Sequence, residues 1–148
     1  MARPGAAKMS TMSKVFFDTN ILIYAADKFD VRKQQISRKI IREAAVDGGG
    51  VVSTQVLQEF IVIATKKLGL SPLEAKEAAK SFLNFETVVV SPDLVFDAVD
   101  AMILNKVSFW DSLIVCAAAK AACEIVYTED LNHGQQILHT TIVNPFVP

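Results

Sequence analysis

The chain has 148 residues, of which 51% are hydrophobic, and a formal net charge of −1 at pH 7. This length fits one ordinary domain, and the near-zero charge excludes a global field that would draw the protein to nucleic acid or to an anionic membrane. The longest apolar run, residues 113–119, is far shorter than the roughly 18 residues of a membrane span. We therefore expect a soluble, cytoplasmic protein that has no membrane partner.

The first 13 residues carry Arg3 and Lys8, contain no acid and lack the apolar core of a secretory signal. We expect residues 1–13 to be a disordered N-terminal extension and residues 14–148 to form one domain. Met9 and Met12 are alternatives to Met1 as the translation start.

Short apolar runs alternate with helical patterns along the rest of the chain. The predicted strands are residues 15–17, 51–53, 87–90, 125–128 and 141–143, and the predicted helices are residues 19–26, 31–46, 54–68, 72–82, 93–106 and 111–122. Alternating strands and helices indicate βαβ units with helices on both faces of a parallel sheet. The fold class is therefore α/β, a three-layer α/β/α sandwich around a central parallel sheet of about five strands.

The last predicted helix is apolar on every side and has Lys120 as its only charge after Asp111. Such a helix belongs in the interior of a domain. Cys116 and Cys123, seven residues apart, would lie about 10 Å apart along a helix axis, too far for a disulfide. We expect both cysteines to be buried thiols in a reducing compartment.

Two acidic positions follow predicted strands directly, Asp18 after the first and Asp130 after the fourth. In an open parallel sheet, ligands bind in the crevice outside the carboxyl ends of the strands. Asp111 opens the apolar helix, and Glu59 lies early in the helix that follows the second strand. These four acids are the candidate catalytic residues.

Each acid also has a purely structural interpretation. Asp18 could cap a helix, Asp111 could complete a capping box with Ser108, and Asp130 could serve turn chemistry before a glycine. Glu59 shares a helical face with Gln55, Val62 and Lys66 and could belong to a solvated stripe. The pattern around each acid, considered alone, does not identify that acid as catalytic.

As a set, the four motifs resemble the PIN-domain family. The segments Phe-Phe-Asp-Thr-Asn, Val-Leu-Gln-Glu-Phe, Trp-Asp-Ser-Leu-Ile and Tyr-Thr-Glu-Asp occur in order, and the similarity extends from about residue 14 to residue 146. The C-terminal half is similar to the ribonuclease toxins of VapBC-type toxin–antitoxin pairs. The resemblance implies an acidic site of Asp18, Glu59, Asp111 and Asp130, supported by Asn20 and Thr128.

Four carboxylates in one place repel one another unless a cation neutralises them. Oxygen-only ligation suits Mg²⁺ or Mn²⁺ and argues against zinc, and one or two ions could bind. The predicted reaction is attack of a metal-activated water on an RNA phosphodiester. The resemblance implies products with 5′-phosphate and 3′-hydroxyl ends.

The residues that contact RNA are less clearly predicted than the four acids. Arg32, Arg38, Lys39 and Arg42 form the densest basic run, which could be a solvated helix face or a phosphate track leading to the acids. His133 could touch the substrate or form a hydrogen bond locally, whereas His139 is expected at the surface. Lys66 and Lys67 end a predicted helix, where they would pair with its dipole.

Three functions compete. The first is an endoribonuclease toxin with a cognate antitoxin, and an RNA-processing nuclease outside such a pair is its variant. The second is a non-catalytic RNA-binding or scaffolding module with the same fold. The third is a phosphotransfer domain, but no lysine follows Lys120 to assist an acceptor aspartate. A homodimer is also expected because the chain is unusually apolar.

Overall fold

The computed structural model describes residues 13–148. The predicted N-terminal extension therefore lies outside the described residues except for Ser13, as do Met9 and Met12. The described part is an α/β fold, as the alternation of strands and helices predicts.

A single six-stranded sheet forms the middle layer. Its strands stand in the order β3-β2-β1-β4-β6-β5, and all neighbouring pairs are parallel except the antiparallel pair of β5 and β6. The strands are β1 (Val15–Phe17), β2 (Gly50–Ser53), β3 (Glu86–Val88), β4 (Ile125–Tyr127), β5 (Gln136–Ile137) and β6 (Thr140–Val143). The sixth strand, β5, was not predicted, because two residues at the edge of a sheet carry no apolar run.

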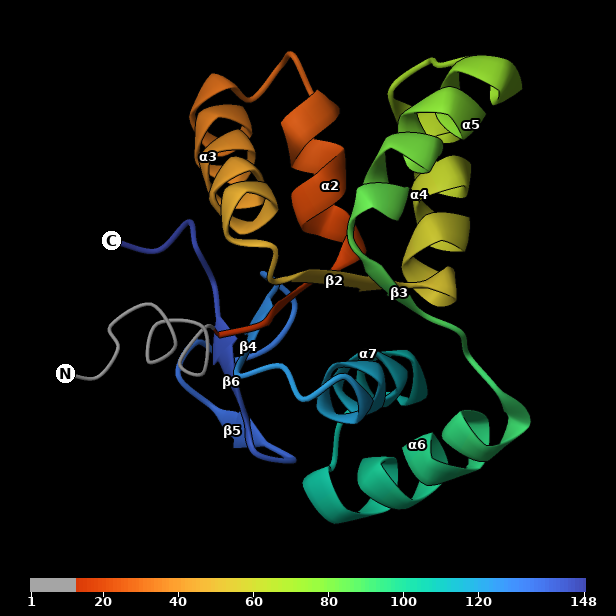
Figure 1. Ribbon diagram of the computed structural model, residues 1–148, viewed down its shortest axis with the longest axis vertical. Helices are drawn as coiled ribbons and strands as arrows, with labels where there is room; N and C mark the ends of the chain where they lie inside the picture. The colour runs from red at the N-terminus through yellow and green to blue at the C-terminus, as the bar shows by residue number, and fades with distance from the viewer. Residues whose placement is uncertain (1–12) are drawn as a thin grey trace, which may run out of the picture.

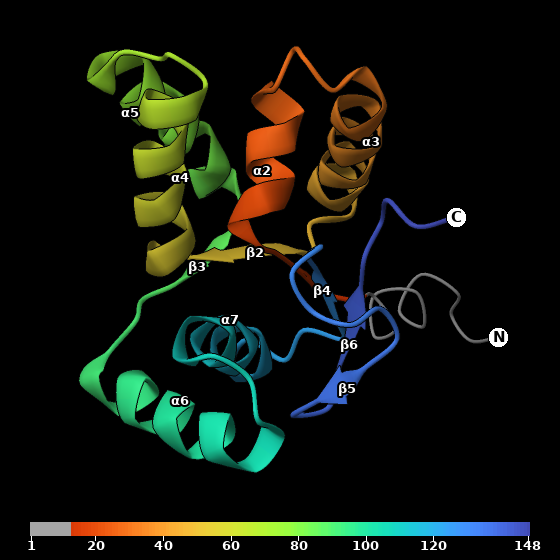
Figure 2. The ribbon, with the colours of Figure 1, turned by 180° about the vertical axis from the view of Figure 1, so that it is seen from behind.

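Two layers of helices enclose this sheet. The α-helices of residues 13–148 are α2 (Thr19–Ala26), α3 (Val31–Asp47), α4 (Thr54–Lys67), α5 (Pro72–Ser81), α6 (Pro92–Asn105) and α7 (Phe109–Lys120), with a short 3₁₀ helix at Phe82–Asn84. Helices α2 to α5 cover one face of the sheet, and α6 and α7 cover the other (Figures 1 and 2). The predicted three-layer sandwich is confirmed.

Serine side chains begin four of these helices. Ser53, Ser71, Ser91 and Ser108 each accept a hydrogen bond from the backbone N–H three residues later, which satisfies an amide that the helix itself cannot pair. Gly48 ends α3 in the left-handed conformation, with φ of 74°, which glycine adopts without a steric penalty. These local signals fix where the helices begin and end.

Buried apolar side chains form the core on both sides of the sheet. Phe16 and Phe17 are successive residues of β1 that point to opposite faces, and both are fully buried. Helix α7 is buried from Ser112 to Ala118, as its apolar sequence predicts. Cys116 and Cys123 are both free and buried, and burial raises the pKa of the Cys123 thiol to about 12.

No single helix of the described chain is long and apolar enough to cross a membrane. Helices α6 and α7 taken together have the length and apolar composition of a span, but they are bent by 111° relative to each other. Residues 112–118 of α7 are buried in the core of the domain, which accounts for the apolar composition of this helix.

Candidate functional site

Parallel pairing brings three chain segments to one edge of the sheet. Strands β1 and β4 are parallel neighbours, so Asp18 and the segment after Tyr127 emerge side by side. Strand β2 lies on the other side of β1 and leads directly into α4, which carries Glu59. The topology therefore places three of the predicted acids at the carboxyl ends of adjacent strands.

Asp18 is the most buried of the acids, with 5% of its surface exposed. Its Oδ1 accepts a hydrogen bond of 2.7 Å from the backbone N–H of Thr19, and its Oδ2 accepts one of 2.8 Å from Thr128 Oγ1. Asp18 thus caps α2 and faces the site at the same time. Burial raises the pKa of Asp18 to about 7, against the two hydrogen bonds, which lower it.

The Thr128 hydroxyl joins Asp18 to Asp130. While it donates to Asp18, it accepts hydrogen bonds from the backbone N–H of Asp130 at 3.0 Å and from Asn20 Nδ2 at 3.4 Å. Asn20 Nδ2 also donates to Asp130 Oδ2 at 3.0 Å. The two residues predicted to support the acids, Asn20 and Thr128, therefore lie between them.

The surroundings of Asp130 raise the pKa of its carboxyl group. Burial raises its pKa, and the nearby negative charge of Asp111 raises it further, whereas the hydrogen bond from Asn20 lowers it. The Asp130 charge in turn raises the pKa of Asp18, as does that of Glu59. All four predicted acids are thus within electrostatic range of at least one other.

Glu59 points to the site and not into open solvent. Thr19 Oγ1 donates a hydrogen bond of 2.7 Å to Glu59 Oε1, and Gln55 Nε2 lies 3.3 Å from Glu59 Oε2. The same Gln55 amide lies 3.3 Å from the carbonyl oxygen of Trp110, at the start of α7. A chain of hydrogen bonds thus runs from Asp130 through Asp18 to α4 and on to α7.

Asp111 stands at the edge of this network. Its backbone N–H donates a hydrogen bond of 3.1 Å to Ser108 Oγ, which is one half of the predicted capping box. The half-buried Asp111 side chain follows Trp110, which lines the same pocket as the other three acids.

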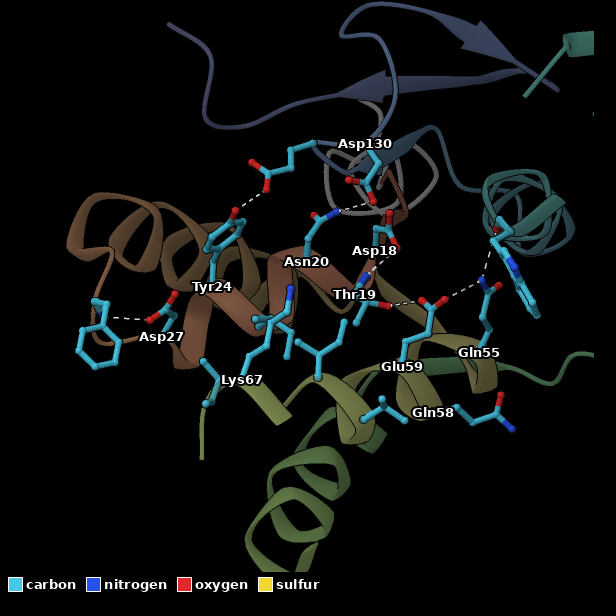
Figure 3. Close-up of a pocket in the computed structure, with 17 residues that line it drawn as sticks. Asp18, Thr19, Asn20, Tyr24, Asp27, Gln55, Gln58, Glu59, Lys67 and Asp130 are labelled. Atoms are coloured by element: carbon cyan, nitrogen blue, oxygen red, sulfur yellow. Dashed lines mark hydrogen bonds between the residues drawn. The ribbon is translucent and has the colours of Figure 1, made fainter. Parts of the chain in front are cut away.

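The pocket itself has a volume of about 840 Å³ and opens between α2, α4 and the loop after β4 (Figure 3). One part of its wall is polar and includes three of the four predicted acids together with Asp27 and Glu129, and another part is apolar. The lining residues are Asp18, Thr19, Asn20, Ile23, Tyr24, Asp27, Phe29, Gln55, Gln58, Glu59, Val62, Ile63, Lys67, Leu68, Trp110, Glu129 and Asp130.

Within residues 13–148, no three His, Cys, Asp or Glu side chains are already arranged to hold a metal ion. Asp18, Glu59 and Asp130 instead accept hydrogen bonds from neighbouring side chains. Two further oxygens, Asn20 Oδ1 and Gln55 Oε1, are buried without a hydrogen-bond partner in the residues described. Buried oxygens without partners beside three carboxylates suit a hard, hydrated cation such as Mg²⁺ or Mn²⁺.

The predicted RNA-binding residues lie elsewhere. Arg32 donates a hydrogen bond to the carbonyl oxygen of Phe146, and Arg38 donates one to that of Ala25. Lys39 and Arg42 line a separate surface depression on α3. His133 is exposed, and its Nδ1 accepts a hydrogen bond of 3.0 Å from the backbone N–H of Asn144. None of these five residues lines the acidic pocket.

Several pocket residues had no predicted role. Lys67 lines the pocket from the last turn of α4, where the sequence suggested only pairing with the helix dipole. Gln55 lies one turn before Glu59 on the same helical face, a spacing that could have indicated their contact. Trp110 directly precedes Asp111, but no helical pattern shows that its side chain reaches this pocket.

A scan of protein-family models matches the PIN domain over residues 15–135. Similar folds among solved structures include the sarcin–ricin-loop-cleaving toxin VapC20 of Mycobacterium tuberculosis, with a TM-score of 0.66, 19% identity and coverage of 79% of this chain and 90% of that one. A toxin–antitoxin complex from Klebsiella pneumoniae matches with a TM-score of 0.67 and 22% identity over 90% of this chain and 98% of that one.

The DNA-bound VapBC complex of Salmonella typhimurium matches with a TM-score of 0.64 and 19% identity, over 88% of this chain and 97% of that one. At these identities the structural matches establish the fold alone. No curated protein matches the chain.

Proposed function

The chain belongs to the PIN-domain family, and on that premise we propose that it is a Mg²⁺- or Mn²⁺-dependent endoribonuclease of the cytoplasm, the toxin of a toxin–antitoxin pair. The observation that carries this proposal is the buried Asp18, whose two oxygens are fixed between Thr19 and Thr128 while Glu59 and Asp130 line the same pocket. A carboxylate kept there against its desolvation cost is typical of a functional site and rarely of a structural one.

The residues that would hold the ion are Asp18, Glu59, Asp111 and Asp130, directly or through water. A bound ion would supply a water-derived nucleophile near neutral pH and would neutralise charge on the phosphate. Asn20 and Thr128 hold Asp18 and Asp130 in place through their hydrogen bonds. Asn20 Oδ1 and Gln55 Oε1 remain free to accept hydrogen bonds from water in the pocket.

Substituting Asp18 by Asn tests the catalytic role. We expect RNA cleavage to fall at least about a hundredfold, because several kcal/mol of transition-state stabilisation depend on the ion. RNA binding, measured by fluorescence anisotropy of a labelled RNA, should persist. Removal of divalent ions with EDTA should abolish cleavage by the wild-type protein, and Mg²⁺ or Mn²⁺ should restore it.

The competing proposal is a non-catalytic RNA-binding module with the same fold. It predicts RNA binding by the wild-type protein without cleavage at any concentration of Mg²⁺ or Mn²⁺. Mass spectrometry of the product ends separates the two, because an enzyme of the proposed kind leaves 5′-phosphate and 3′-hydroxyl ends. Intact RNA throughout would rule out the nuclease.

The proposed protein partner is an antitoxin. Similar folds occur in the toxin–antitoxin complexes from Klebsiella pneumoniae and Salmonella typhimurium. The apolar wall of the pocket, formed in part by Val62, Ile63 and Leu68, could receive an apolar helix face. Co-expression with the neighbouring open reading frame should yield a complex in which cleavage is inhibited. Without such a gene, an RNA-processing nuclease becomes the better assignment.

A homodimer is the proposed assembly. Helix α6 exposes Phe96, Val99 and Ile103 at helical spacing, with Leu104 beside them, and together these form an apolar surface stripe. Light scattering behind size-exclusion chromatography should give twice the mass of the chain. Substituting Ile103 by Glu should reduce that mass to one copy if the stripe forms the interface.

A further inference from the structure

We propose that Trp110 is a stacking platform for a nucleobase of the substrate, next to the phosphate that is cleaved. The inference rests on the proposed nuclease function and adds to it a binding residue that the acidic motifs do not include. Trp110 is exposed over 61% of its surface, although it is large and apolar, and it lines the acidic pocket.

The structure holds Trp110 in a defined place. Its ring packs edge-on against Phe109, with ring centroids 5.1 Å apart and planes at 76°. Its carbonyl oxygen lies 3.3 Å from Gln55 Nε2, and Gln55 also contacts Glu59 (Figure 3). Phe109 therefore packs against the indole, and Gln55 links the backbone of Trp110 to an acid of the site.

The place of Trp110 in the chain, next to Asp111, explains how an exposed ring could serve substrate binding. Trp110 directly precedes Asp111 at the start of α7, so the backbone that carries the acid also carries the ring. A strand of nucleic acid that sets a phosphate at the acids must place its neighbouring bases within a few ångströms. An aromatic face at that distance binds any base, because every base presents a π-face.

The chain contains one tryptophan, so its intrinsic fluorescence reports on Trp110 alone. The titration uses a short single-stranded RNA and the Asp18→Asn variant, which prevents cleavage. We expect the RNA to quench the fluorescence along the same curve as the anisotropy of labelled RNA. In a W110F/L73W variant, the tryptophan would lie on α5, outside the pocket lining, and RNA should not quench its fluorescence.

Kinetics supply a second measurement. Trp110→Ala should raise the KM for RNA cleavage about tenfold or more, whereas Trp110→Phe should stay close to the wild type, because phenylalanine keeps an aromatic face. Leu73→Ala, which removes a similarly exposed apolar side chain on α5 outside the pocket, is the control and should leave KM unchanged. A melting temperature close to that of the wild type would exclude misfolding of the Ala variant.

The outcomes separate this inference from the proposed function. Cleavage by the wild-type protein with no quenching and a normal KM for Trp110→Ala would overturn the stacking role and leave the nuclease intact. Quenching without any cleavage would keep the stacking role and overturn the nuclease. If Trp110→Ala abolished only the capture of a protein partner, Trp110 would be a protein contact and the inference would be wrong.

Discussion

Thr128 donates a hydrogen bond of 2.8 Å to Asp18, although the two residues are 110 positions apart in the sequence. The bond lowers the pKa of a carboxyl that burial raises to about 7. It forms because β1 and β4 are parallel neighbours and both residues follow the ends of these strands. The same hydroxyl accepts hydrogen bonds from the Asn20 side chain and from the backbone N–H of Asp130, so it contacts three other residues of the site.

Thr128→Val, which keeps the shape and removes the hydroxyl, should raise the pKa of Asp18 further. A hydrogen bond to an ionised group is worth about 1.5–3 kcal/mol, so we expect a shift of about one unit or more. NMR titration of the metal-free protein measures the pKa, and the pH profile of cleavage should move to higher pH. Thr128→Ser restores the hydroxyl and should restore both values, and equal behaviour of the two variants would contradict this role.

Asp18 should also make the metal-free fold less stable as pH rises. Its pKa in the unfolded chain is near the ordinary value of 3.8, and in the folded protein it is about 7. Between these values the folded state binds more protons than the unfolded state, so the free energy of unfolding falls with increasing pH and levels off above about 7. Asp130, whose pKa is also raised, contributes in the same direction.

Urea unfolding in EDTA from pH 5 to pH 8 measures this slope. Asp18→Asn should flatten it and should be more stable than the wild type at pH 8 by on the order of a few kcal/mol. Mg²⁺ should stabilise the wild type and have much less effect on the variant, because a ligand stabilises the state that binds it. A stability of the wild type that rises across this pH range would contradict the expectation.

Part of this site could be predicted because two of its acids, Asp18 and Asp130, follow strand ends. The apolar run before Asp18 and the run before Thr128 each mark a buried strand, and parallel strands bring their carboxyl ends to one edge. The four acids were identified as a set through the family motifs, since each one alone also fitted a cap, a turn or a solvated face. The fold followed from the alternation of strands and helices.

What the sequence could not predict depends on contacts between distant elements. No local pattern indicates that Lys67 of α4 lines a pocket with Glu129, or that Arg32 and Arg38 donate to backbone carbonyls. Strand β5 is only two residues long, and its pairing with β6 depends on a tight turn that lacks glycine. These features arise from tertiary packing, which sequence periodicity does not contain.

Lys67 should contribute to RNA binding, whereas Lys66 should not. Both are exposed residues in the last turn of α4 and interact equally with the helix dipole, but only Lys67 lines the acidic pocket. Lys67→Ala should raise the KM for RNA several-fold and reduce the salt dependence of binding by about one phosphate contact. Lys66→Ala is the matched control, and an equal loss in both variants would indicate a diffuse charge effect.

The ion pair of Lys33 and Glu129 should stabilise the loop that carries Asp130. Lys33 Nζ lies 2.8 Å from Glu129 Oε2, 4.6 Å from the centre of the Tyr24 ring and 5.2 Å from that of Phe146. Tyr24 also donates a hydrogen bond to Glu129. About a quarter of each charged side chain is exposed, so water weakens this pair only in part.

A double-mutant cycle with Lys33→Met and Glu129→Gln should give a coupling free energy of about 1 kcal/mol in urea unfolding. The Lys80–Glu77 pair is the control. It is 3.9 Å long and more than half exposed, and its coupling should be a few tenths of a kcal/mol at most. Equal coupling in the two pairs would show that the partial burial of the first pair adds nothing.

The turn between β5 and β6 should be a site where the protein can be stabilised. Leu138 and His139 have φ of 52° and 68°, the two positive values of a type I′ turn, in which Asn-Gly is preferred. Replacing the pair by Asn-Gly should raise the free energy of unfolding by about 1 kcal/mol, because a positive φ destabilises a residue other than glycine by roughly that much.

The opposite change at Gly134 provides the control for this turn. Its φ is 86°, and an added Cβ would meet no atom within 4 Å, so Gly134→Ala should cost about 1 kcal/mol through backbone conformation alone. Thermal unfolding measures both variants. Because none of these residues lines the acidic pocket, cleavage activity at low temperature should stay at the wild-type level. A destabilised Asn-Gly variant would mean that the Leu138 side chain, 37% exposed, contributes more through packing than its backbone conformation costs.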